Sequence, residues 1–237
     1  MTDLAADTAA LAQARDRVLE RIAGAAERVG RDPAGVTLVA VSKTVPAERL
    51  RAAVAAGLTI LGENRVQEAE AKVPELPSAT WHLVGPLQSN KARRAIELFD
   101  TIETVHSIEL ARRLDGLLGS APGGGRRAVL LQVNVDRDPA KSGFLPDDLA
   151  RALEDLDAFE RLDYRGLMTV GRLVEDPEQA RPAFAALRSL SERIRTSWPR
   201  LGAGLSMGMS DDFEVAVEEG ATIVRVGRAL FGERPTG

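Results

Sequence analysis

Residues 36–57 read VTLVAVSKTVPAERLRAAVAAG, an apolar run followed by a helical pattern. The run at 36–41 is rich in β-branched residues, which are typical of buried strands. Pro46 stands where a helix would start, and Gly57 stands where it would end. This stretch therefore predicts one strand followed by one helix.

The same strand and helix pairing recurs along the rest of the chain, giving about eight units in all. The expected pairs are 58–61 with a helix from about 63, 80–84 with a helix from about 87, 101–105 with 108–118, 129–135 with 147–156, 164–169 with 177–196, 205–207 with 211–219, and 222–226 with a short closing helix at 228. In front of them, residues 4–29 have apolar positions at helical spacing, namely Leu11, Val18, Ile22 and Val29.

Strands that alternate with helices predict a parallel sheet, and eight of them in a chain of 237 residues favour a closed barrel. We therefore expect an α/β protein with a single (β/α)8 TIM barrel domain over residues 1–237. Residues 1–30 are expected to form an extra helix that packs on the barrel. The alternative is a doubly wound open sheet, but no G-x-G-x-x-G turn follows the first strand.

The composition excludes several classes of function. The chain has no cysteine and only two histidines, His82 and His106, so thiolate chemistry is excluded and no metal site is expected. A net charge of −4 gives no reason to expect nucleic acid or a membrane surface as a partner. The start of the chain does not resemble a signal peptide, so we expect a cytoplasmic protein. We also expect a monomer, because no second domain offers an obvious interface.

Lys43 directly follows the first predicted strand. In a parallel barrel the carboxyl ends of the strands carry the functional groups, so Lys43 would lie at the barrel mouth. Desolvation there favours the neutral amine, which can attack a carbonyl. On local sequence alone, a surface lysine that merely ends a strand is the other interpretation.

The last two predicted strands end in segments that are suited to a phosphate group. Barrels often bind phosphate through the loops after strands seven and eight. Gly227 permits close backbone approach after the eighth strand, and Ser206 at the seventh could add a hydroxyl donor. Asp211 and Asp212 would repel a phosphate, so we place it mainly at the Gly227 turn. Ser210 is interpreted as a helix N-cap.

Arg225 and Asn64 complete the candidate set. An arginine inside the last strand must meet an acceptor if it points into the barrel, because it does not lose its proton. A pyridine nitrogen and a barrel glutamate are the two alternatives. Asn64 stands at a strand end, where it could hydrogen-bond a cofactor oxygen. His82 in the third strand is interpreted as a buried core histidine.

Five stretches at the ends of predicted strands together resemble the pyridoxal phosphate homeostasis protein family (PLP-binding proteins), whose fold is similar to the N-terminal barrel of alanine racemase. These stretches are residues 40–43, 62–68, 81–91, 206–210 and 224–227. The resemblance covers nearly the whole chain, and it implies pyridoxal 5'-phosphate (PLP) as the cofactor.

By this resemblance, Lys43 would hold PLP as an imine, Ser206 and Gly227 would hold its phosphate, Arg225 would face the pyridine nitrogen, and Asn64 would lie near the ring. Lys141 matches a family loop. Two residues depart from the family pattern. Arg228 replaces an expected small hydroxyl residue, and Arg65 stands where an aromatic residue is common.

Arginine beside the pyridine nitrogen disfavours its protonation and so weakens PLP as an electron sink. Racemisation also needs an acid or base on each face of the imine, and the only tyrosine, Tyr164, is expected at the barrel bottom. We therefore expect an exchangeable PLP carrier without catalytic residues, with amino acids and PLP-requiring apoenzymes as partners. A weak PLP-dependent racemase and an aldolase-type Schiff-base barrel are the alternatives.

Overall fold

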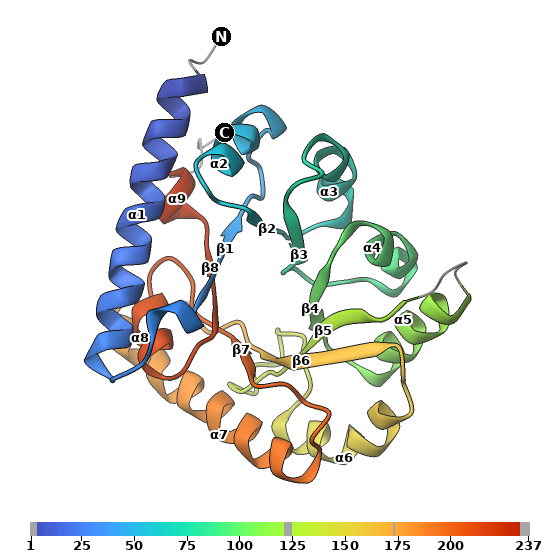
Figure 1. Cartoon of the computed structure of the whole chain (residues 1–237). Helices are drawn as coiled ribbons and strands as arrows, with labels where there is room; N and C mark the ends of the chain where they lie inside the picture. The colour runs from blue at the N-terminus through green and yellow to red at the C-terminus, as the bar shows by residue number, and fades with distance from the viewer. Residues whose placement is uncertain (1–3, 121–124, 173, 233–237) are drawn as a thin grey trace.

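The computed structural model describes residues 4–120, 125–172 and 174–232. Eight parallel strands form a closed barrel in sequence order, which confirms the predicted (β/α)8 fold (Figure 1). The strands are β1 Thr37–Val41, β2 Ile60–Glu63, β3 Thr80–Leu83, β4 Thr101–Val105, β5 Arg127–Gln132, β6 Leu162–Met168, β7 Gly204–Ser206 and β8 Ile223–Val226. The barrel closes where β1 pairs with β8, with Val39 opposite Arg225.

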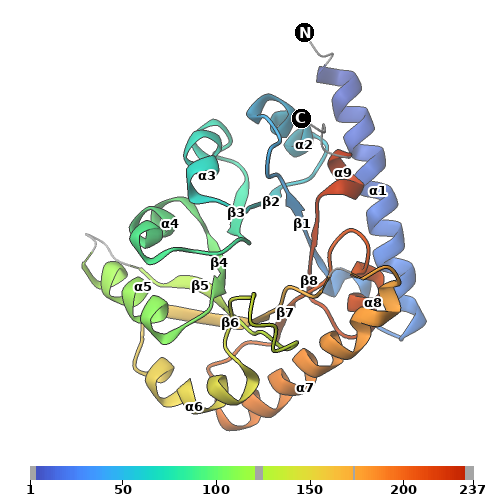
Figure 2. The same ribbon diagram turned by 180° about the vertical axis from the view of Figure 1, so that it is seen from behind.

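Helices surround the barrel, as both views of the ribbon show (Figures 1 and 2). They are α1 Leu4–Arg28, α2 Ala47–Ala55, α3 Val66–Lys72, α4 Ala92–Leu98, α5 Ile108–Ser120, α6 Pro146–Asp157, α7 Arg181–Ser197, α8 Phe213–Glu218 and α9 Arg228–Phe231. None of the helices within the described ranges is long and apolar enough to span a membrane.

Several helices begin later than the sequence pattern predicts, among them α7, which follows the 3-10 turn Pro177–Ala180. Glu63 was expected to open a helix, but its carbonyl accepts the N–H of Val84, so it is the last residue of β2. After β3 the chain passes through the 3-10 turn Ser89–Lys91 before α4 begins at Ala92. Asp211 and Asp212 lie before α8 rather than in its first turn.

Helix α1 lies along the outside of the barrel beside α2, α8 and α9 (Figures 1 and 2). Its buried face includes Leu11, Val18 and Ile22, as the spacing predicts. Val29 does not belong to this face and is 45% exposed, because the helix ends at Arg28. Burying each of these large aliphatic side chains contributes about 2 kcal/mol, so this face fixes α1 to the barrel.

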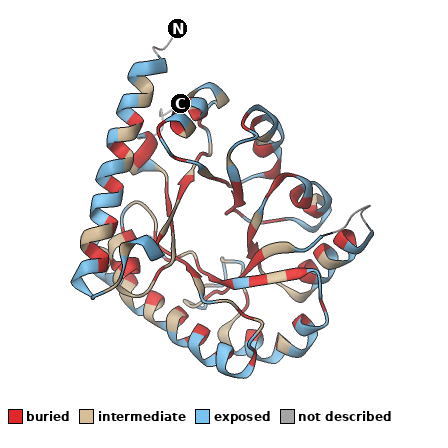
Figure 3. Ribbon diagram, in the orientation of Figure 1, coloured by how far each residue is buried: buried red, intermediate tan, exposed pale blue. Residues whose placement is uncertain are grey.

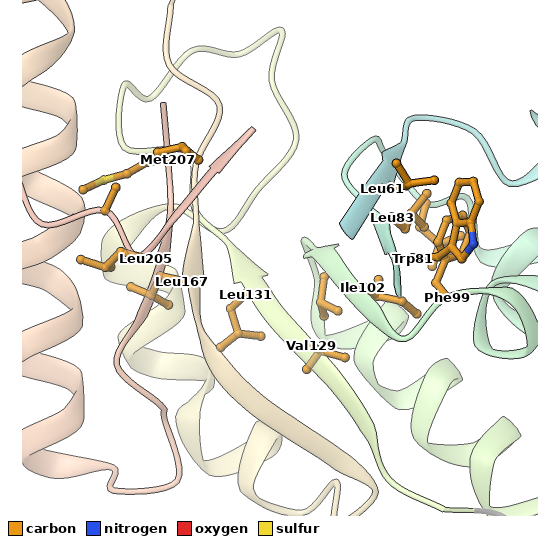
Figure 4. Close-up of a cluster of buried hydrophobic side chains, with 14 of the residues drawn as sticks. Leu61, Trp81, Leu83, Phe99, Ile102, Val129, Leu131, Leu167, Leu205 and Met207 are labelled. Carbon is orange, nitrogen blue, oxygen red and sulfur yellow. The ribbon is translucent and has the colours of Figure 1, made fainter. Parts of the chain in front are cut away.

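The apolar core lies mainly between the strands and the surrounding helices. Burial is concentrated on the strands and on the inner faces of the helices (Figure 3). Leu61, Trp81, Leu83, Phe99 and Ile102 gather in one part of this layer (Figure 4). This outer layer is apolar, so the polar side chains that the strands bury inside the barrel form a separate set.

Candidate functional site

Lys43 lies at the carboxyl end of β1, between the ends of two neighbouring strands. Pairing of Ala40 with Val226 places the Gly227 turn beside it on one side. Pairing of Val41 with Gly62 places Asn64 beside it on the other. Three of the five predicted site residues therefore meet at one end of β8, β1 and β2.

The turn that carries Lys43 is held by a buried ion pair on its helix-facing side. The Ser42 hydroxyl donates to Glu63 Oε1 at 2.7 Å. Lys72 Nζ donates to the same oxygen at 2.6 Å and to the Ser42 carbonyl at 2.9 Å. These contacts fix Ser42, the residue before Lys43, just after the carboxyl end of β1.

The sequence did not predict that the ion pair of Glu63 and Lys72 supports the turn at Lys43. Glu63 is fully buried, and burial raises the pKa of its carboxyl group, although hydrogen bonds from Lys72 and Ser42 oppose that rise. Its second oxygen, Oε2, is buried without a hydrogen-bond partner among the described residues. A glutamate that ends a β-strand and a lysine nine positions later give no sequence signal of such a pair.

The Gly227 turn contacts the loop after β7 through Ser210. The Gly227 N–H donates to the Ser210 hydroxyl oxygen at 3.3 Å. Ser210 is therefore not a helix N-cap, and that interpretation was wrong, since Asp212 precedes α8. A serine hydroxyl thus lies at the turn where the sequence places the phosphate.

The charged residues beside this turn have partners in the protein. Arg228 forms an ion pair with Asp211 on the surface. The Asp212 carboxylate accepts the N–H of Met209 at 2.6 Å, and burial raises the pKa of this carboxyl group. The cation at Arg228 is thus directed toward Asp211.

Gly208 is required by the close packing of this loop. Its φ is +90°, and an added Cβ would lie 2.5 Å from Ala216 Cβ and 2.9 Å from Phe213 Cα. The Gly208 carbonyl accepts the N–H of Arg225 at 3.0 Å. This glycine therefore lets the loop lie against α8 and align with β8.

Ser206 and Arg225 face the inside of the barrel, where both are buried. The Ser206 hydroxyl donates to Glu103 Oε2 at 2.5 Å and accepts from Arg225 Nη1 at 2.5 Å. Arg225 Nη2 donates to the Thr169 carbonyl at 2.7 Å. In this structure Arg225 is linked to Glu103 through the Ser206 hydroxyl, which matches the alternative of a barrel glutamate. A contact between Arg225 and a pyridine nitrogen stays a prediction.

The predicted phosphate contact of Ser206 also stays a prediction. Its side chain is 0% exposed, and its hydroxyl already joins Glu103 and Arg225. A hydroxyl has one proton to donate, and here Glu103 receives it. Of Ser206 and Ser210, it is Ser210 whose hydroxyl lies against the Gly227 turn.

Glu103 is the negative centre of this buried network. His82 Nδ1 lies 2.7 Å from Glu103 Oε1, so His82 is a buried, hydrogen-bonded histidine as expected. Burial would raise the pKa of Glu103, but the hydrogen bond and charge of His82, with the charge of Arg225, hold it below its usual range. Burial lowers the pKa of Arg225, and the carboxylates of Glu103 and Asp212 oppose that effect.

Asn64 lines a pocket of about 770 Å³ together with Arg65, Gln88 and Lys91. Lys141 lies in the loop after β5, where its Nζ contacts Asp136 Oδ2 at 3.1 Å and the Val170 carbonyl at 3.0 Å. Both residues follow the carboxyl ends of strands.

Tyr164 lies in the first half of β6, and its hydroxyl donates to the Leu156 carbonyl. As expected, the tyrosine is therefore at the end of the barrel opposite Lys43.

The sequence matches the model of the alanine racemase N-terminal domain over residues 15–235. It is 44% identical to the pyridoxal phosphate homeostasis protein of Pseudomonas aeruginosa, over 93% of this chain and 94% of that protein. The structure of PipY from Synechococcus elongatus PCC7942, with PLP bound, has a TM-score of 0.79 and 43% identity, covering 91% of this chain and 100% of that one. The structure of alanine racemase from Clostridium difficile has a TM-score of 0.69 and 16% identity, and the match covers 92% of this chain and 60% of that one. The two proteins share the fold.

Proposed function

Because this chain belongs to the pyridoxal phosphate homeostasis protein family, we propose that it binds PLP as an exchangeable imine on Lys43 and serves intracellular PLP homeostasis. The observation that carries the proposal is the meeting of Lys43, Asn64 and the Gly227 turn at the ends of three adjacent strands. The PLP bound to the relative PipY supports the same cofactor.

The donors at this end of the barrel fit the functional groups of PLP. Lys43 supplies the amine that reacts with an aldehyde. The Gly227 turn with the Ser210 hydroxyl offers donors for a phosphate, and Arg225 offers N–H groups for a ring nitrogen. When bound, PLP supplies an aldehyde that forms imines with amines and a ring that withdraws electrons.

The surroundings of Arg225 favour holding PLP over carbanion chemistry. Arginine keeps its proton, so a guanidinium beside the ring nitrogen disfavours a second positive charge there. The only tyrosine of the chain lies at the opposite end of the barrel. We propose that an incoming amine, such as an amino acid, displaces Lys43 and releases PLP, with PLP-requiring apoenzymes as recipients.

The test is the visible absorption band of the imine after PLP is added. Wild-type protein and Lys91→Ala should show the band, because Lys91 lies in the pocket beside Asn64 but not at the end of β1. Lys43→Ala should lose it. A protein that stays colourless with PLP and traps only a sugar phosphate on borohydride reduction would contradict the proposal.

A further inference from the structure

A chain of four buried polar side chains crosses the inside of the barrel. It runs from His82 on β3 to Glu103 on β4, then to Ser206 on β7 and Arg225 on β8. Strands β4 and β7 are not neighbours in the barrel, so this contact passes through its interior. All four residues are at most 7% exposed.

Such a chain is costly to bury unless every charge is compensated. Glu103 uses one oxygen for His82 and the other for Ser206. Arg225 Nη1 lies 4.0 Å from Glu103 Oε2, so a hydroxyl separates the two charges instead of a direct contact. The serine bridge and the Thr169 carbonyl together hold both Nη atoms of the guanidinium in place.

We propose that Glu103 is a positioning residue that acts on bound PLP through Arg225, with Ser206 as the bridge and His82 orienting the carboxylate. The inference rests on the proposed function, in which Arg225 meets the pyridine nitrogen. Glu103 fixes the direction of the guanidinium and offsets its positive charge. The ring then meets an oriented donor whose positive charge is partly offset.

The charges around the imine predict in which direction the loss of Glu103 shifts the pH at which the imine loses its proton. The protonated imine on Lys43 is a cation, so a nearby positive charge destabilises it. Glu103 faces both His82 and Arg225, and Asp212, the residue before α8, also acts on Arg225. Neutralising Glu103 removes one of the two carboxylates that act on Arg225, and the imine then loses its proton at a lower pH.

The experiment titrates the visible band of the protonated imine in wild type, Glu103→Gln and a control, Thr104→Val. Thr104 is the next residue of β4, is buried, and donates to the Gly85 carbonyl rather than to the network of Glu103. Glu103→Gln should lower the titration midpoint by about one pH unit, and Thr104→Val should leave it unchanged. Glu103→Asp, which keeps the charge, should restore most of the midpoint.

Two further outcomes separate this inference from the function on which it rests. A wild-type protein that forms no imine contradicts the proposed function itself. A Glu103→Gln variant that forms the imine with the wild-type midpoint overturns the role of Glu103 and leaves the function intact.

If Glu103→Gln does not fold, Ser206→Ala replaces it and PLP release is measured. Loss of one hydrogen bond to a charged group should speed release about tenfold. Wild-type release from a folded Ser206→Ala variant would overturn the inference.

Discussion

The N–H of Gly227 donates to the hydroxyl oxygen of Ser210, which joins the turn after β8 to the loop after β7. Ser206, four residues earlier, is instead enclosed in the barrel between Glu103 and Arg225. Two serines four residues apart therefore have different surroundings. Ser210 lies at the proposed phosphate turn, and Ser206 lies against the proposed partner of the ring nitrogen.

Ser210→Ala is expected to weaken PLP binding about tenfold, because a hydroxyl next to a phosphate is lost. Arg228→Ala is the matched control on the same turn. Its side chain is 49% exposed and paired with Asp211, so its removal should change the affinity less than about twofold. Titration of PLP by fluorescence quenching measures both. Equal loss in the two variants would mean that Arg228, not Ser210, contacts the phosphate.

Lys72→Met is expected to destabilise the fold by about 3 kcal/mol, because it leaves the buried Glu63 carboxylate unpaired. Burial already raises the pKa of Glu63 in the folded state. A raised carboxyl pKa gives stability that is present at low pH and is lost as pH rises through the folded value. The loss in Lys72→Met should therefore be smaller at about pH 5 than at about pH 8.

Urea unfolding of wild type and Lys72→Met at the two pH values measures this difference. Arg94→Met, which removes an exposed ion pair with Glu70 on the neighbouring helix, is the control and should cost less than about 1 kcal/mol. A loss in Lys72→Met that does not change with pH would show that Glu63 does not take up the proton.

Gly208→Ala is expected to destabilise the protein by about 2 kcal/mol or more, because the new methyl would meet Ala216 and Phe213. Gly232→Ala is the matched control. Its φ of +86° is similar to the +90° of Gly208, but an added Cβ there has no neighbour within 4 Å among the residues that the structure describes. Thermal unfolding should show the larger loss at Gly208. Equal losses would assign the whole effect to backbone conformation.

The sequence predicted the barrel well because each strand is a short apolar run and each helix has a regular apolar face. The strand at residues 101–105 matches the prediction at both ends. Glu63 was misassigned because a charged residue after an apolar run resembles the start of a helix, whereas Lys72 satisfies it from α3.

The site was predicted less completely than the fold. Lys43, Asn64 and Gly227 meet because their strands are neighbours, which follows from the order of the strands. The contacts of Ser206 and Ser210 depend on how one loop turns at Gly208, and no local pattern shows that. Glu103, a charged residue in the middle of a buried strand, was the available signal for the interior network.

Borohydride reduction of the PLP-loaded protein, followed by peptide mass mapping, tests the central claim most directly. Reduction converts an imine into a stable bond, so the modified peptide identifies the lysine. The account predicts one labelled site, Lys43 at the end of β1. Label on Lys72, Lys91 or Lys141 with Lys43 unmodified would contradict it.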